Sequence, residues 1–355
     1  MLFGQSAAER TFYDAAKSGR LHHAWLLCGP RGVGKATLAW RIARALRAAS
    51  SKNLSDKLVE AAAPEAFWQV DPDHPVARQI AAGSEPYVRA LTRTVNERTG
   101  RLRTQIVIED VRALAPFFQF SIPDGGWRVV IIDPVDEMNA QAANALLKML
   151  EEPPERTLIL LVAHQPARLL PTIRSRCRSL RLAPLEVDDM NAALGQAGFD
   201  QRRQEVALTE LAAGSVGTAI WLVQNDGLAF YADLIALLGT LPRTDRARAL
   251  SLSERAAQRG APEQRDLIFA LLDVALTRLA RTGAQGAPPQ REAAAGEGAI
   301  LARLAPTPHP GRAWAAAAQA ISARVSHGLA VNLDPAALVL DTVRKLTETA
   351  RGHCA

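Results

Sequence analysis

The sequence predicts an α/β fold in its first half and an all-helical second half. Three segments dominated by apolar residues, 24–28, 127–133 and 158–163, have the length of strands and alternate with segments of helical character. Continuous apolar strands of this kind are typical of a parallel sheet that helices cover on both faces. Beyond about residue 183, apolar residues recur at helical spacing and no apolar strand follows.

Local signals set the elements of the first half. Ser6 and Glu9 have the spacing of a helix-capping box, and Gly19 is a natural helix stop. A later helix ends before Pro153. The expected elements are helix 6–18, strand 24–28, helix 35–49, strand 105–108, helix 109–120, strand 127–133, helix 139–152, strand 158–163 and strand 180–182.

Two segments lack a clear pattern, and one helix start is well marked. Residues 50–103 are interrupted by prolines and carry no consistent period. Residues 283–298 are rich in glycine, alanine and proline and are expected to form a flexible connection. Asp334 and Pro335 have the residue types of an N-cap and a first helical position, so the last helix is predicted to begin there.

Composition and length are those of a globular protein and argue against several functional classes. The 355 residues are 48% hydrophobic and 22% charged, enough for two or three domains. Cys28, Cys177 and Cys354 form no C-x-x-C pair, which argues against structural zinc and suits a reducing cytoplasm. Because we find neither a signal peptide nor an apolar window of about 18 residues, we predict a cytoplasmic protein without a membrane span.

The most informative motif is the glycine-rich loop at 29–36, between a predicted strand and a predicted helix. It fits the phosphate-binding pattern G-x-x-x-x-G-K-[ST] except at its last position. Backbone amides of such a loop surround a polyphosphate, and Lys35 is expected to reach the outer phosphates. Ala36 stands where a hydroxyl normally binds Mg²⁺, and Thr37 points about 100° further around the helix. The loop therefore predicts a nucleotide site with impaired hydrolysis.

A second nucleotide motif is an apolar strand that ends in an acid, Asp133. Asp133 is expected to hold Mg²⁺ through water, whereas Pro134 has no carboxylate to orient an attacking water. A core strand with an acid at its tip is the alternative, and the pairing with the glycine loop argues against it. The residues expected to bind nucleotide are Gly29, Gly32, Val33, Gly34, Lys35, Ala36, Thr37 and Asp133.

A third feature is the arginine-rich stretch 171–178, which contains Ser175, Arg176 and Cys177. With these motifs the chain resembles the AAA+ clamp-loader subunits of bacterial DNA polymerase III, and among them the delta-prime type. The resemblance is strong over 1–182 and continues more weakly through the helical half. The matching segments are 3–5, 23–26, the glycine loop, 127–136, 144–154, 175–177 and 332–335.

The resemblance implies an AAA+ core over 1–182, a helical lid over 183–243 and a C-terminal helical collar over 244–355 that oligomerises. It also implies a hetero-oligomeric ring that opens a sliding clamp and places it on primed DNA. In that ring Arg176 is expected to be an arginine finger, acting in trans on the ATP site of a neighbouring motor subunit. The alternative is that Arg176 only pairs with an acid at a subunit seam.

The chain departs from the family's motor subunits at three positions. Ala36 replaces the hydroxyl residue, Pro134 replaces the glutamate of Asp-Glu-Ala-Asp, and Gly217 replaces the lid arginine that senses phosphate. Three catalytic elements are missing together, which indicates a non-hydrolysing subunit of the delta-prime type. Family members often hold zinc through a cysteine-rich module after the first helix, but residues 50–103 contain no cysteine, so no zinc is expected.

Two other functions stay open. Because Gly34, Lys35 and Asp133 are intact, the chain could be a clamp-loader subunit with its own slow ATP hydrolysis, binding ATP or ADP with Mg²⁺. The net charge of +6 fits either a DNA-binding module or only a GC-rich genome that favours arginine and alanine. The expected partners are gamma/tau-type motor subunits and a delta-type subunit. The sliding clamp and primer-template DNA are expected to be contacted through the assembled complex.

Overall fold

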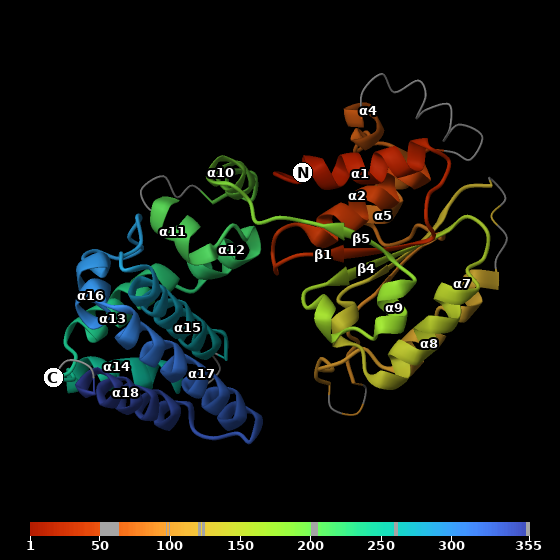
Figure 1. The fold of residues 1–355 in the computed structure, drawn as a ribbon. Coiled ribbons are helices and arrows are strands. Elements are labelled where there is room, and N and C mark those ends of the chain that lie inside the picture. Colours follow the sequence, from red (N-terminus) through yellow and green to blue (C-terminus); the bar gives the residue numbers. More distant parts are fainter. Residues whose placement is uncertain are drawn as a thin grey trace. The chain divides into compact units, whose positions relative to one another are not determined.

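The computed structural model describes residues 1–49, 64–96, 98, 100–119, 122, 125–199, 205–258 and 262–352. The chain divides into two compact units, Met1–Gln196 and Ala197–Ala355. Figure 1 shows a sheet with helices in the first unit and helices in the second. This arrangement confirms the predicted α/β core followed by helical structure. The finer division at 182/183 and 243/244 stays a prediction.

The first unit is built on a five-stranded parallel sheet with the order β2-β3-β4-β1-β5. Because all the strands run the same way, their carboxyl ends meet at one edge of the sheet, where ligands of open α/β folds bind. In register, Cys28 lies opposite Ala163 on one side and Arg181 on the other. The strands are β1 (Ala24–Cys28), β2 (Val88–Leu91), β3 (Arg128–Ile132), β4 (Thr157–Ala163) and β5 (Arg178–Arg181).

Helices cover both faces of this sheet (Figure 1). On β1, Leu26 belongs to the core cluster that includes Leu146 of α8, whereas Trp25 contacts Phe12 of α1 with ring centroids 5.2 Å apart. The helical elements are α1 (Ser6–Lys17), α2 (Lys35–Ala48), α4 (Pro64–Trp68), α5 (Pro75–Ala81), α6 (Ile108–Arg112), α7 (Ala115–Gln119), η1 (Val135–Glu137), α8 (Ala140–Glu151), η2 (Pro166–Arg168), α9 (Pro171–Ser175) and α10 (Val187–Gln196).

Four sequence predictions for this unit need correction. The capping box at Ser6 is wrong, because the N-cap is Gln5 without a side-chain cap, and Glu9 pairs instead with Arg41 at 3.0 Å. The strand at 105–108 is wrong, because Ile106 forms only an isolated bridge.

The helix predicted at 109–120 is two short helices, α6 and α7. The segment 50–103, which showed no pattern, contributes the edge strand β2. That strand was missed because its two middle residues are exposed and break the apolar run. Residues 50–63 lie outside the described residues.

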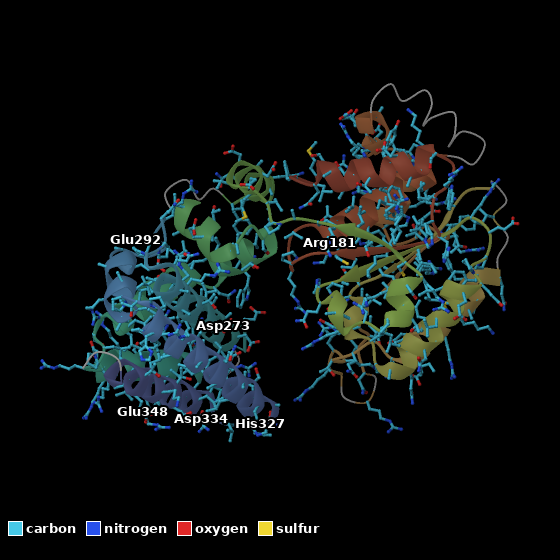
Figure 2. All side chains as sticks on the ribbon, in the orientation of Figure 1. Arg181, Asp273, Glu292, His327, Asp334 and Glu348 are labelled. Carbon is cyan, nitrogen blue, oxygen red and sulfur yellow. The ribbon has the colours of Figure 1, made fainter. Side chains whose placement is uncertain are left out.

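Among the described residues of the second unit, every regular element is a helix. The Asp334 side chain caps the last helix by accepting from the backbone amides of Ala336 and Ala337, which confirms the predicted helix start (Figure 2). The helices are α11 (Glu205–Ala212), α12 (Val216–Gln224), α13 (Gly227–Gly239), α14 (Arg246–Ala256), α15 (Pro262–Gln285), α16 (Glu297–Leu304), α17 (Pro308–Ala330) and α18 (Pro335–Arg351).

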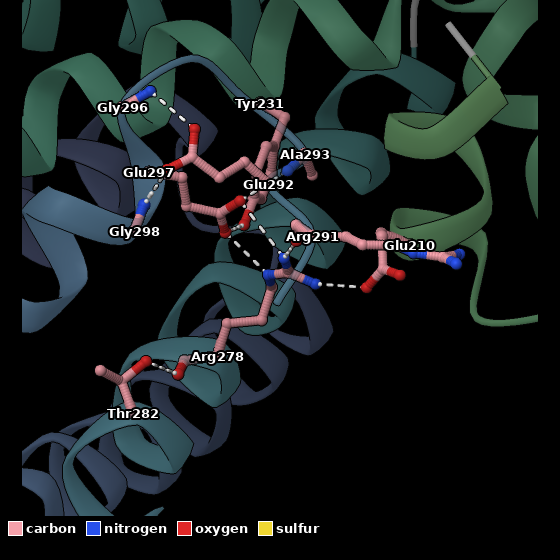
Figure 3. Close-up of polar contacts among 10 residues, drawn as sticks. All are labelled: Glu210, Tyr231, Arg278, Thr282, Arg291, Glu292, Ala293, Gly296, Glu297 and Gly298. Carbon is pink, nitrogen blue, oxygen red and sulfur yellow. Dashed lines mark hydrogen bonds and ion pairs between the residues drawn. The ribbon is translucent and has the colours of Figure 1, made fainter. Parts of the chain in front are cut away.

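The flexible connection expected at 283–298 is wrong. Helix α15 runs to Gln285, and the segment after it is held by buried polar contacts (Figure 3). Glu297, fully buried, accepts from the Tyr231 hydroxyl at 2.6 Å and from Arg278 Nε at 2.7 Å. Arg278 also pairs with Glu210 of α11 at 3.2 Å. These contacts tie α11, α13, α15 and α16 into one unit.

Among the described residues, no single helix is long and apolar enough to cross a membrane. Two consecutive helices, Val206–Ala212 and Val216–Gln224, are together long and apolar enough for a membrane span, but the chain bends by 117° between them.

Candidate functional site

The glycine-rich loop joins β1 to α2 at the carboxyl edge of the sheet. Gly29, Gly32 and Gly34 have φ of 151°, 73° and 98°, a region that residues with side chains rarely adopt. A Cβ on Gly29 would lie 2.5 Å from the carbonyl oxygen of Leu182. The loop conformation therefore requires glycine, as the phosphate-binding pattern predicts.

An N-terminal residue supports this loop. The Gln5 side chain, 3% exposed, donates through Nε2 to the carbonyls of Val33 at 3.2 Å and Ala183 at 2.8 Å. Gln5 was noticed only as part of a matching segment, and its contact with the loop spans residues far apart in the sequence.

Lys35 is turned back onto its own loop. Its ammonium donates to the Gly29 carbonyl at 2.7 Å and to the Pro30 carbonyl, and the residue is only 3% exposed. Burial lowers the pKa of Lys35 to about 8, although the nearby Asp133 and Asp136 carboxylates act in the opposite direction. A phosphate in the loop would have to draw this ammonium away from the two carbonyls.

Asp133 follows β3, and its charge interacts with that of Lys35. Its backbone amide donates to the Leu91 carbonyl at 3.0 Å, which fixes the end of β3 against β2. Burial raises the pKa of Asp133, and the Lys35 charge opposes that rise. Ala36 and Thr37 lie in the first turn of α2, and Thr37 is exposed.

The two carboxylates that follow Pro134 are engaged elsewhere. Asp136 accepts the backbone amides of His164 at 3.1 Å and Gln165 at 2.8 Å, so it caps the turn after β4. Glu137 pairs with Arg31 of the glycine loop at 2.7 Å and with Arg93 at 3.1 Å. Neither carboxylate is free to take the place of the glutamate that Pro134 replaces.

His164 is a further residue of this site that sequence reasoning missed. It directly follows β4, whose last residue, Ala163, pairs with Cys28 next to the glycine loop. Its Nδ1 is buried and has no hydrogen-bond partner within the described part of the chain. Burial lowers the pKa of His164, the Lys35 and Arg31 charges lower it further, and the Asp136 and Glu137 charges oppose. A polar residue just after a buried parallel strand was the signal that could have found it.

Arg176 does not join this group. It follows α9 directly, where its Nη2 pairs with Oε1 of Glu151 at 2.7 Å and its Nη1 donates to the Thr172 carbonyl at 3.0 Å. The two side chains are 36% and 49% exposed, so the pair lies at the surface. Arg181, at the end of the neighbouring strand β5, is also exposed (Figure 2).

The stretch in which Gly217 was expected to stand in place of a phosphate-sensing arginine forms the start of α12. The Ser215 hydroxyl accepts from the Thr218 amide at 3.0 Å and caps α12, and Gly217 lies in its first turn. Within the described ranges, no group of three or more His, Cys, Asp or Glu side chains could hold a metal ion.

Comparison with known proteins agrees with these motifs. Residues 4–186 match the family model described as "DNA polymerase III, delta subunit". The chain is 39% identical over 155 residues to the delta-prime subunit of DNA polymerase III from Pseudomonas aeruginosa, covering 44% of this chain and 41% of that protein. It is 29% identical over 285 residues to the tau subunit from Escherichia coli, covering 78% of this chain and 40% of that protein.

The chain thus spans about two fifths of the length of these curated relatives. A crystal structure of a DNA polymerase III gamma subunit-related protein from Thermotoga maritima covers 98% of this chain and 99% of its own, with 17% identity and a TM-score of 0.42.

Proposed function

Because the chain belongs to the DNA polymerase III delta-subunit family, we propose that it serves as a non-motor, delta-prime-type subunit of a replicative clamp loader. In this role it assembles in the cytoplasm with gamma/tau-type motor subunits and a delta-type subunit. It supplies Arg176 in trans to a neighbouring ATP site and helps to load a sliding clamp on primed DNA.

The observation that carries this proposal is the state of the carboxylates around the glycine loop. Hydrolysis needs a group that orients water and a ligand that completes the Mg²⁺ site. Pro134 and Ala36 supply neither, and Asp136 is held by backbone amides. Glu137 is held by two arginines. The loop therefore keeps the shape of a nucleotide site without the groups for turnover.

Nucleotide binding is the part of the site that the chain retains. Three glycines with positive φ shape the loop, and Lys35, once drawn from the Gly29 carbonyl, would contact the phosphates of ATP or ADP, with Asp133 near any accompanying Mg²⁺. Bound nucleotide would then stabilise this subunit rather than drive its motion, since any ligand of the folded state does so.

The test is steady-state ATP hydrolysis by the purified chain, compared with Lys35→Ala. We expect no turnover above the variant, and a loss of motor-subunit hydrolysis when Arg176→Ala enters a reconstituted loader. Arg174→Ala, which removes an exposed arginine of α9 two residues before Arg176, is the matched control. Turnover by the lone chain that disappears in Lys35→Ala would favour the alternative function, a clamp-loader subunit with its own slow ATP hydrolysis.

A further inference from the structure

The guanidinium of Arg176 is held within its own chain. Its Nη1 donates to the carbonyl of Thr172, four residues earlier and in α9, at 3.0 Å. Its Nη2 pairs with Glu151, the last residue of α8, at 2.7 Å. The side chain therefore folds back over α9 toward the end of α8, and both of its terminal nitrogens are occupied.

We propose that Glu151 is a latch that holds Arg176 in a parked position and competes with the phosphate of a neighbouring subunit for its charge. This inference rests on the proposed function, in which Arg176 acts in trans. Nη2 of Arg176 is engaged by Glu151 and Nη1 by the Thr172 carbonyl, so turning the guanidinium fork toward a phosphate in the bidentate manner requires release from Glu151.

The charge of the competing phosphate determines when Arg176 leaves Glu151. Glu151 carries one negative charge, whereas a triphosphate with its developing transition-state charge carries more, so the phosphate attracts the cation more strongly. A neighbouring site that is empty or holds a nucleotide without its outer phosphate attracts it less. Arg176 is then expected to leave Glu151 only when the adjacent site is filled with triphosphate and closely apposed.

Because the Glu151–Arg176 pair lies at the surface, its effect on Arg176 can be tested apart from any effect on folding. Side chains 36% and 49% exposed form an ion pair that contributes little to folding stability. Removing the charge of Glu151 should therefore leave the thermal unfolding midpoint of the chain unchanged. Any effect on the loader would then reflect the position of Arg176 rather than loss of fold.

The experiment is ATP hydrolysis by a loader reconstituted with the full chain, without clamp or DNA. The variants are Glu151→Gln, Arg176→Ala and the two combined. Glu152→Gln is the matched control, because it removes a neighbouring exposed charge at the end of the same helix. We expect Glu151→Gln to raise hydrolysis roughly two- to fivefold, the range that follows from the free energy of an exposed ion pair. Glu152→Gln should leave the rate unchanged.

Two further results support the latch specifically. The combined variant should hydrolyse ATP at the rate of Arg176→Ala, since a latch has no effect without the residue it holds. The ratio between Glu151→Gln and the original chain should shrink toward one as salt rises, because salt screens exposed ion pairs.

The outcomes separate the latch from the proposed function. If Arg176→Ala lowers hydrolysis but Glu151→Gln leaves it unchanged or also lowers it, the latch is wrong and the trans-acting arginine stands. If Arg176→Ala has no effect, the proposed arginine finger is wrong and the latch falls with it.

Discussion

Glu137 pairs with Arg31 of the glycine loop at 2.7 Å, and the same carboxylate also pairs with Arg93 at 3.1 Å. A carboxylate that follows Pro134 closely in sequence thus neutralises a loop cation. The side chain of Arg31 is 70% exposed, and Glu137 is the carboxylate with which it pairs.

This relationship predicts the behaviour of Glu137→Ala. Freed from Glu137, Arg31 should add positive potential to the glycine loop and raise ATP affinity by roughly two- to fivefold, the scale of an exposed pair. The measurement is equilibrium titration with labelled ATP. Asp73→Ala, which releases Arg78 from another exposed pair, is the control and should change nothing. If Glu137→Ala instead abolished a measurable hydrolysis rate, Glu137 would be a working base and the non-motor assignment would be contradicted.

Lys35 predicts a pH dependence of nucleotide binding. Burial lowers its pKa to about 8, and phosphate binds the protonated ammonium. Affinity should therefore be highest below pH 8 and fall by up to about tenfold per pH unit above it. Titrations between about pH 7.5 and 9.5 would measure this, with Lys35→Arg as a control that stays charged throughout. A flat profile for the original chain would show that Lys35 does not contact phosphate.

The same pKa predicts a dependence of stability on pH. Since the pKa of Lys35 is lower in the folded than in the unfolded chain, the unfolded state binds more protons between about pH 8 and 10.5. Stability should therefore gain from this residue as pH rises through that window. Urea unfolding of the original chain and Lys35→Met at about pH 8 and 10 would measure the difference, which should be absent in the variant.

Replacing Glu297 is expected to destabilise the helical unit strongly. It is fully buried and accepts from Tyr231 and Arg278, so Glu297→Ala leaves the buried Tyr231 hydroxyl without its acceptor and leaves Arg278 only its pair with Glu210 and the Arg291 carbonyl. We expect about 3–5 kcal/mol of destabilisation in urea unfolding. Glu348→Ala, which breaks the exposed pair with Arg344, should leave the unfolding midpoint close to that of the original chain. Similar losses in both variants would contradict the central place of this network.

The close approach of α15 and α17 at Gly283 predicts that this position cannot accept a larger residue without loss of stability. A Cβ at Gly283 would lie 2.5 Å from the Cα of Gly311, so the backbones of α15 and α17 approach too closely for any side chain. Gly283→Ala should destabilise the unit by about 1–3 kcal/mol through overpacking. Gly195→Ala in α10 is the control, because nothing lies within 4 Å of its Cβ position and alanine favours helix. A neutral Gly283→Ala would mean that the helices can separate freely.

Several parts of the fold and site followed from local sequence. The glycine loop, its flanking strand and helix, and the strand ending at Asp133 were predicted because their apolar runs and glycines act over a few residues. Edge strand β2 was missed because its outward residues break that pattern. The helix expected at 109–120 is interrupted, because residues 113 and 114 form a turn between α6 and α7.

The sequence by itself determined which groups are present: a phosphate loop with Lys35, an acid at Asp133, and no hydroxyl or glutamate at Ala36 and Pro134. Only the tertiary structure decided what the remaining charges do. Glu137 meets Arg31 across 106 positions of chain, and Glu151 meets Arg176 through the packing of α8 beside α9. Such pairings depend on how distant elements pack, and no local period or spacing in the sequence records them.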